Sequence, residues 1–118
     1  GEEEKRFRKF AENFKDLTVG FATGPKTDSL IFCNITNAEA TRKNAWDILV
    51  EHLNCPATEI ASFGDSEQDM YFIENAGYGS AMETSPEKVL EQAKYKVQSV
   101  EKDGVTKILK EWLELGYV

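Results

Sequence analysis

The first apolar pattern in the chain is a stripe of phenylalanines at helical spacing. Phe7, Phe10 and Phe14 recur at three- and four-residue intervals within residues 2–15, and most of the other positions carry charged side chains. This pattern predicts an amphipathic helix. We expect the phenylalanine stripe to pack in a core, because that is the usual role of such a face.

A turn-rich connector next separates two runs of β-prone residues. The connector at 23–28 contains glycine and proline, and the flanking runs cover residues 17–22 and 29–35. Two such runs around a short turn-rich segment predict a β-hairpin. The polar residues that follow, 36–41, indicate a loop and a boundary between two modules.

From residue 38 onward, helix and strand patterns alternate. The expected elements are a helix over 38–53, a strand over 60–63, a helix over 66–75, a strand ending at Met82, a helix from Pro86 to Lys94 with Ser85 as its N-cap, a strand over 95–100 and a last helix beginning at Asp103 and Gly104. Such alternation is typical of a parallel sheet with crossover helices. The fold class is therefore α/β.

Composition excludes several classes of protein. At 118 residues the chain has the length of a single domain. Its 21 acidic and 14 basic residues give a net charge of -7, which disfavours a general nucleic-acid surface. No apolar run approaches the roughly 18 residues that a membrane helix needs, so we expect no membrane partner.

The two cysteines suggest neither a zinc site nor a disulfide framework. Cys33 and Cys55 are far apart in the sequence, contain no CxxC motif and are accompanied by a single histidine, His52. We expect both to be buried free thiols in a cytoplasmic protein.

The strand over 60–63 leads directly into two acidic residues. Asp65 and Asp69 are four residues apart, so a helix over 66–75 would place both carboxylates on one face of its first turn. Ligands bind at the carboxyl ends of strands in open α/β sheets, and paired carboxylates there suit Mg²⁺. Asp65 and Ser66 acting only as helix caps is the alternative.

Two basic residues lie near the predicted start of a helix, a position that is unfavourable for positive charge. Arg42 and Lys43 lie near the beginning of the helix over 38–53, although the helix dipole disfavours cations there. A bound anion nearby would account for this placement, and a solvated charge is the alternative.

Four motifs occur in order from Arg42 to the C-terminus. They are Lys43 at a helix start, the GDxxxD sequence Gly64-Asp65-Ser66-Glu67-Gln68-Asp69, the strand Ala76-Gly77-Tyr78-Gly79-Ser80-Ala81-Met82, and the helix start Asp103-Gly104-Val105. Together they resemble the C-terminal half of haloacid dehalogenase-like phosphatases, most closely the Cof-like subfamily with an α/β cap. The resemblance implies a partial Rossmann-like core over residues 37–118, preceded by the tail of the cap domain over residues 1–36.

The resemblance also implies a mechanism and the residues that carry it. Phosphoryl transfer would depend on Mg²⁺ and proceed through an aspartyl-phosphate. Asp65 would be a metal ligand, and Asp69 would support that ligand or the waters of the metal. Lys43 would neutralise charge on the transferring group. Gln68, where the subfamily usually has Asn, would reach the phosphate or substrate, and Asn44 replaces a common Gly.

The family's nucleophile has no counterpart in this sequence. The six aspartates form no DxD motif; they are residues 16, 28, 47, 65, 69 and 103. We therefore expect the chain to be the C-terminal portion of a phosphatase that acts on a small phosphorylated metabolite such as a sugar phosphate. A catalytically silent binding or assembly domain is the alternative. The strand over 60–63 would then be an exposed edge that pairs with the missing half or with another copy.

Overall fold

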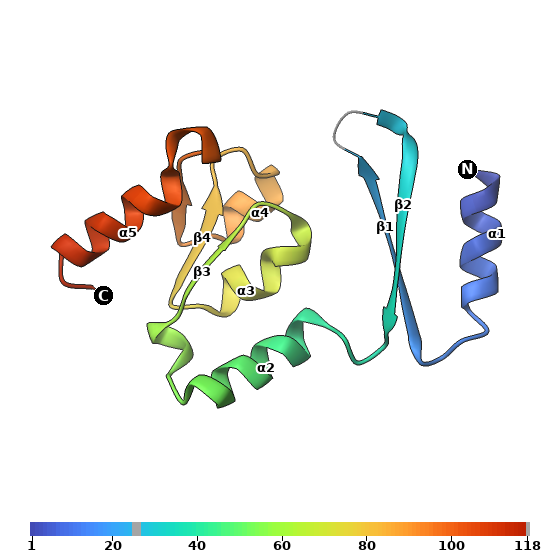
Figure 1. Cartoon of the computed structure of the whole chain (residues 1–118), viewed down its shortest axis with the longest axis horizontal. Coiled ribbons are helices and arrows are strands. Elements are labelled where there is room, and N and C mark those ends of the chain that lie inside the picture. Colours follow the sequence, from blue (N-terminus) through green and yellow to red (C-terminus); the bar gives the residue numbers. More distant parts are fainter. Residues whose placement is uncertain (25–26, 118) are drawn as a thin grey trace. The chain divides into compact units, whose positions relative to one another are not determined.

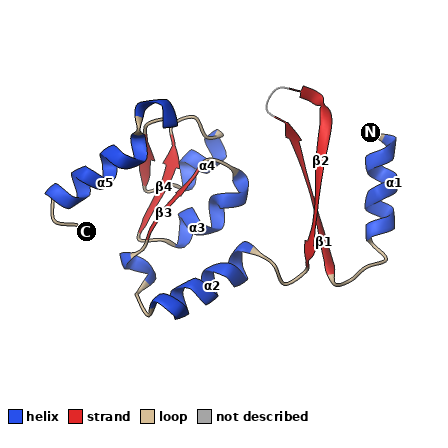
Figure 2. Cartoon of the chain, viewed as in Figure 1, coloured by secondary structure: helices blue, strands red, loops and turns tan. Residues whose placement is uncertain are grey.

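The chain contains two compact units. The computed structural model describes residues 1–24 and 27–117, and its internal contacts separate Gly1–Asn44 from Ala45–Val118. Figure 1 follows the chain through both units from blue to red. Each unit has its own kind of sheet, as Figure 2 shows.

The first unit consists of one helix and an antiparallel hairpin. Its elements are α1 (Glu2–Ala11), β1 (Leu17–Gly24) and β2 (Thr27–Asn37). β1 and β2 pair from Leu17 opposite Asn37 onward, with an irregularity between Thr23 and Gly24. The predicted hairpin is confirmed, although Pro25 and Lys26 of its connector lie outside the described residues.

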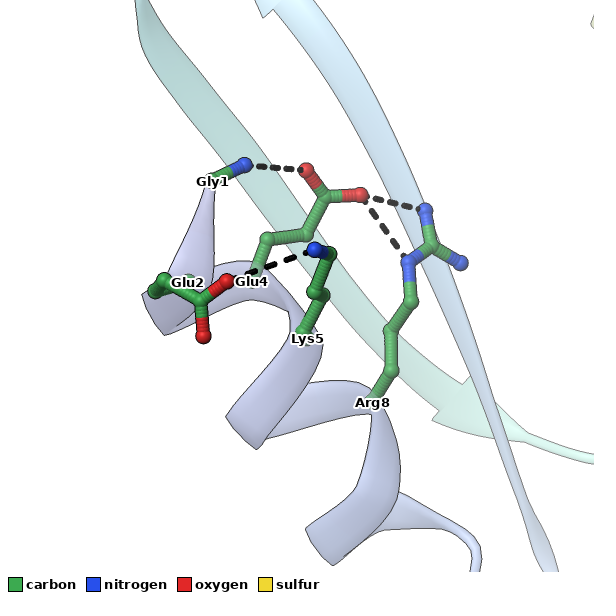
Figure 3. Close-up of polar contacts among 5 residues, drawn as sticks. All are labelled: Gly1, Glu2, Glu4, Lys5 and Arg8. Atoms are coloured by element: carbon green, nitrogen blue, oxygen red, sulfur yellow. Dashed lines mark hydrogen bonds and ion pairs between the residues drawn. The ribbon is translucent and has the colours of Figure 1, made fainter.

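The carboxylate of Glu4, in the first turn of α1, makes charged contacts that stabilise the helix (Figure 3). Glu4 Oε1 accepts hydrogen bonds from Arg8 Nε at 2.9 Å and Nη2 at 2.7 Å, and Glu4 Oε2 lies 3.4 Å from the amino group of Gly1. Lys5 Nζ donates to Glu2 Oε1 alongside. The hydrogen bonds from Arg8 lower the pKa of Glu4. These pairs span three or four residues, the spacing that stabilises a helix surface.

The phenylalanine stripe of α1 is not a buried core face in the described chain. Phe7 is half-buried, but Phe10 is 59% exposed and Phe14 is 45% exposed. The rings of Phe10 and Phe14 instead contact each other, with centroids 5.3 Å apart. α1 ends at Ala11, so Phe14 lies beyond it. The prediction of core packing is therefore wrong for these two residues, because helical spacing reports an apolar face but not a partner to cover it.

The second unit is built on a parallel sheet of three strands. β3 (Ala61–Gly64), β4 (Tyr78–Met82) and β5 (Tyr95–Val97) lie side by side in that order. Ala61 pairs with Tyr78, and Ser80 pairs with Tyr95. The predicted parallel α/β architecture is confirmed, with β3 at one edge of the sheet.

Between residues 38 and 117, four helices and three short 3₁₀ turns accompany the three strands of this sheet. They are α2 (Arg42–Leu53), η1 (Ala57–Glu59), η2 (Glu67–Asp69), α3 (Met70–Asn75), α4 (Glu87–Gln92), η3 (Val100–Lys102) and α5 (Gly104–Glu114). Within residues 1–24 and 27–117, no helix has the length and apolar character needed to cross a membrane.

The two faces of the parallel sheet carry different kinds of core. On one face, Ile73 of α3 and Val89 of α4 are fully buried with Ala81 of β4. On the other face, Trp112 of α5 is buried and its ring contacts those of Phe63, Tyr78 and Tyr95. The rings of Tyr78 and Tyr95 also stack on each other. Side chains alternate along a strand, so Tyr78 and Ala81 of β4 serve opposite faces.

Ser85 does not cap α4. The helix begins at Glu87 with Pro86 as its N-cap residue, and Ser85 N–H donates to Met82 O at 2.9 Å in the preceding turn. The Ser85 side chain is buried, and its hydroxyl makes no hydrogen bond to any residue that the structure describes. The turn after β4 draws Ser85 into the interior, so the prediction of an N-cap serine is wrong.

Both cysteines are free thiols, as predicted, but neither is fully buried. Cys33 on β2 is exposed and Cys55 is half-buried. Partial desolvation, aided by the neighbouring Glu59 carboxylate, raises the pKa of the Cys55 thiol. The expectation of buried cysteines is wrong because Cys33 lies on an exposed part of a two-stranded hairpin.

Candidate active site

The turn between β3 and α3 brings the two predicted acids together. Asp69 Oδ2 accepts a hydrogen bond from Asp65 N–H at 3.2 Å and from Ser66 N–H at 3.1 Å. The Ser66 hydroxyl donates to the same oxygen at 2.8 Å. One carboxylate thus organises the loop by its hydrogen bonds, while the side chain of Asp65 is exposed at the end of the strand.

Gly64 permits this close folding of the turn. A Cβ atom at position 64 would collide with Asp69 Cβ and would press on Ile73 Cδ1. A side chain larger than hydrogen at this position would therefore push Asp69 away from the strand end. The glycine of the GDxxxD sequence has a steric role that the sequence pattern alone does not reveal.

The helix expected over 66–75 is shorter and divided. Residues Glu67–Asp69 form the 3₁₀ turn η2, and the α-helix begins only at Met70. An aspartate that bonds to nearby backbone N–H groups competes with regular helix formation, which explains the irregular start. The segment that holds the two acids is therefore not the α-helical turn that was predicted to place both on one face. Instead, the Asp69 carboxylate accepts hydrogen bonds from the backbone N–H groups of Asp65 and Ser66.

A third acid in the turn, Glu67, forms an ion pair with a lysine of α4. Glu67 Oε2 lies 2.9 Å from Lys88 Nζ on α4, and both side chains are largely exposed. The hydrogen bond to Glu67 raises the pKa of Lys88. Sequence reasoning missed this pair because the two residues are 21 positions apart and belong to different elements.

A second charged cluster lies at the carboxyl ends of β4 and β5. Glu83, directly after β4, accepts hydrogen bonds from Lys102 Nζ at 2.7 Å and from Ser99 N–H at 3.0 Å. The Lys102 ammonium and then the Ser99 N–H lower the pKa of Glu83. The carboxyl ends of parallel strands lie at the same end of the sheet, so Glu83 and Asp65 both follow strands at that end. The sequence signal that could have identified Glu83 is its position directly after a buried strand.

Comparison with known proteins identifies the family. Residues 1–109 match the profile of the haloacid dehalogenase-like hydrolases. This chain belongs to that family. The Cof-like resemblance seen in the motifs is confirmed with it.

Individual relatives agree with this assignment. The YxeH protein of Bacillus subtilis strain 168 is 34% identical over 80 residues, which are 68% of this chain and 30% of that protein. A phosphoglycolate phosphatase of Archaeoglobus fulgidus is 30% identical over 82 residues, 70% of this chain and 37% of the relative. The chain therefore spans about a third of the length of the curated relatives it matches.

A solved structure supports the fold. A haloacid dehalogenase-like hydrolase from B. subtilis superposes with a TM-score of 0.67 at 28% identity, over 92% of this chain and 36% of that one. The predicted haloacid dehalogenase-like α/β fold is thus confirmed, including its parallel sheet.

The helix start that carries Lys43 in this haloacid dehalogenase-like chain is held by side-chain hydrogen bonds. α2 begins at Arg42, four residues later than expected, and Arg42 and Lys43 occupy its first turn. Asn44 N–H donates to Thr41 Oγ1 at 3.1 Å, and Asn44 Nδ2 donates to Glu39 O at 2.7 Å. Asn44 therefore supports the start of the helix.

Lys43 and the acidic turn belong to different compact units. Lys43 lies in Gly1–Asn44, and Asp65, Gln68 and Asp69 lie in Ala45–Val118. Gln68 is exposed within η2, between the two acids of the motif. The structure thus brings Asp65, Gln68 and Asp69 together in one turn, and the approach of Lys43 to that turn remains a prediction.

The donor set of the turn fits a hard divalent cation. Asp65 and Asp69 supply carboxylate oxygens, the ligand type that Mg²⁺ prefers, and Mg²⁺ usually keeps several waters beside one or two protein carboxylates. Within residues 1–24 and 27–117, no three side chains of His, Cys, Asp and Glu are grouped so as to hold a metal. Asp65 and Asp69 are therefore the candidate metal ligands of this turn.

Proposed function

We propose that the chain is the C-terminal part of a Mg²⁺-dependent phosphatase that acts on a small phosphorylated metabolite such as a sugar phosphate. The observation that carries this proposal is the Asp65–Asp69 turn at the end of β3, organised by the hydrogen bonds to Asp69 Oδ2. Membership of the haloacid dehalogenase-like family supports it. The relative named phosphoglycolate phosphatase supports a small phosphate monoester as substrate.

Each site residue has a separate task in this proposal. Asp65, with its exposed carboxylate, ligates the metal, and Asp69 holds the turn in the shape that presents Asp65. A bound Mg²⁺ supplies positive charge that stabilises the phosphoryl oxygens. Lys43 neutralises further charge on the transferring group. Gln68 contacts the phosphate or the substrate.

The nucleophile belongs to a segment outside this sequence in our proposal. None of the six aspartates forms a DxD motif, and the curated relatives are about three times as long as the matched regions. Residues 1–36 would be the tail of the cap domain and residues 37–118 the C-terminal part of the core. The edge of β3 would pair with the missing segment or with another copy.

A cytoplasmic location completes the proposal. Cys33 and Cys55 are both free thiols, and unpaired cysteines are typical of a reducing compartment.

Phosphatase assays with p-nitrophenyl phosphate and Mg²⁺ test the function. The isolated chain is expected to show no turnover, and adding the segment that carries the nucleophile is expected to restore it. In the restored enzyme Asp65→Asn should abolish activity, and Lys43→Ala should reduce the chemical rate by more than about tenfold, because a preorganised charge contributes strongly to the transition state. Turnover by the isolated chain would refute the missing nucleophile. No turnover in the complete protein would favour a catalytically silent binding domain.

A further inference from the structure

The acidic turn contains three carboxylates, but the structure keeps one of them apart. Glu67 lies midway between Asp65 and Asp69 in the sequence, yet its carboxylate is paired with Lys88 at 2.9 Å. In the described part of the chain, no three acidic, histidine or cysteine side chains come together as a metal cluster. Glu67 is thus paired with Lys88 and is not grouped with Asp65 and Asp69 as a third carboxylate beside the proposed metal.

The helix that carries Lys88 is anchored independently of the ion pair. Its neighbour Val89 is fully buried in the core with Ile73 and Ala81. Just beyond the helix, Lys94 Nζ donates to Ala76 O at 2.7 Å, and Lys94 N–H donates to Gly79 O at 2.9 Å. The backbone of α4 is therefore held against α3 and β4, and Lys88 extends from a fixed position toward the turn.

The number of available carboxylates affects which cation a site prefers. Mg²⁺ takes one or two protein carboxylates and keeps its waters, whereas Ca²⁺ takes about six to eight oxygen ligands in a flexible geometry and gains from added carboxylates. We propose that Lys88 is a specificity-determining positioning residue: it holds Glu67 away from the metal and so favours Mg²⁺ over Ca²⁺. This inference rests on the proposed metal site of Asp65 and Asp69.

Metal titrations of the chain with MgCl₂ and with CaCl₂ test the inference without any activity measurement. Backbone amide NMR signals of residues 64–70 report the affinity for each ion. Lys88→Met should raise the affinity for Ca²⁺ relative to Mg²⁺ by about three- to fivefold, a factor that corresponds to one exposed charge pair. Lys88→Gln should give the same change in the ratio.

A matched control separates the role of Glu67 from a general change in charge. Lys102→Met also removes a lysine paired with a glutamate, but that glutamate, Glu83, follows β4 and lies outside the turn. It should leave the ratio of the two affinities within error of the unaltered chain. Glu67→Gln added to Lys88→Met should reverse the gain in Ca²⁺ affinity, because the released carboxylate is then no longer charged.

Two outcomes distinguish failure of the inference from failure of the proposed function. If Asp65→Asn abolishes Mg²⁺ binding but Lys88→Met leaves the Ca²⁺ to Mg²⁺ ratio unchanged, Lys88 has no role in selectivity and the inference is overturned. If millimolar Mg²⁺ leaves the signals of residues 64–70 unchanged, or if Asp65→Asn binds as well as the unaltered chain, the turn is not a metal site and both proposals are overturned.

Discussion

Asp69 shows how one side chain can shape an acidic turn. Its Oδ2 atom accepts hydrogen bonds from two successive backbone N–H groups and from the Ser66 hydroxyl. Such bonds to a charged acceptor are stronger than those between neutral groups. Asp65, in contrast, has an exposed side chain that leaves the strand end. Two residues of the same type therefore have different physical roles within five positions.

This difference can be measured with two alanine variants. Asp69→Ala should lower the free energy of unfolding by about 1–3 kcal/mol, because the N–H groups of Asp65 and Ser66 lose their acceptor. Asp65→Ala should change it by less than about 0.5 kcal/mol, as is usual for exposed positions. Urea denaturation followed by circular dichroism measures both. Equal costs for the two variants would contradict the role assigned to Asp69.

Gly64 provides a steric test of the same turn. Gly64→Ala should destabilise the chain by about 1–3 kcal/mol, because the added methyl group collides with Asp69 and Ile73. Gly20→Ala is the control, since an added Cβ there meets no atom within 4 Å. The urea midpoints of the two variants should differ clearly. A tolerated alanine at position 64 would mean that the turn can relax without losing its shape.

Ser85 and Ser62 form a pair of buried serines with opposite expectations. The Ser62 hydroxyl donates to Phe72 O at 2.9 Å, whereas the Ser85 hydroxyl has no hydrogen-bond partner among the described residues. Ser62→Ala should cost about 1 kcal/mol, and Ser85→Ala should be neutral or stabilising, because an unpaired buried hydroxyl carries a desolvation cost. Thermal unfolding curves compare the two. A lower melting temperature for Ser85→Ala would show that this hydroxyl has a partner in solution.

Among the elements, the end of β4 is linked to β5 by a backbone hydrogen bond and to the turn η3 by the Glu83 carboxylate. Glu83 N–H donates to Val97 O at 2.6 Å, and its carboxylate accepts from Lys102 Nζ and Ser99 N–H. These contacts join the carboxyl ends of β4 and β5 to the segment that leads into α5. One glutamate, Glu83, thus connects the end of β4 to the start of η3.

The pH dependence of stability tests this link. The Lys102 ammonium and the Ser99 N–H hold the pKa of Glu83 below its usual value of 4.5. The stabilising contribution of Glu83 is therefore present above pH 4.5 and is lost as the pH falls through the lowered pKa. Glu83→Gln should lower the urea midpoint at pH 7, and this effect should shrink as the pH is lowered below 4.5. An effect of the variant that does not change with pH would contradict an electrostatic link.

At the scale of the whole molecule, the edge of β3 is the surface on which the proposed pairing depends. Ile60 O accepts from Tyr78 N–H, so the backbone groups of Ser62 and Gly64 point toward β4. Those of Ala61 and Phe63 then point toward the other edge, where the described part of the chain places no strand. The amide of Ser62 therefore reports on the pairing with β4, and the amides of Ala61 and Phe63 report on the unpaired edge.

Amide hydrogen exchange can follow this edge directly. In dilute solution the amides of Ala61 and Phe63 should exchange faster than that of Ser62, because they lack a partner strand. At high concentration, or after addition of the segment proposed to carry the nucleophile, their protection should rise by more than about tenfold while that of Ser62 changes little. Equal protection of all three amides at every concentration would exclude pairing through this edge.

The order of the elements and the position of the acidic turn were determined by sequence alone. The alternation of apolar segments after residue 38 predicted the parallel sheet, and a short apolar run ending in Gly64 and Asp65 indicated where the acidic turn lies. These features are local, since strand and helix periodicity and the GDxxxD spacing depend on residues near one another in the chain. The family resemblance rests on the same local motifs.

Only the tertiary structure decided how the side chains of these elements are used. It paired Glu67 with Lys88 and Glu83 with Lys102 and left Phe10 exposed. It also buried the Ser85 hydroxyl with no hydrogen-bond partner among the residues that the structure describes. The physical reason is that burial and charge pairing depend on residues about 20 positions apart or more, which meet only when helices pack on the sheet. Periodicity predicts that a face is apolar or that a turn is acidic, but the packing of neighbouring elements determines what covers the face and which cation pairs with the acid.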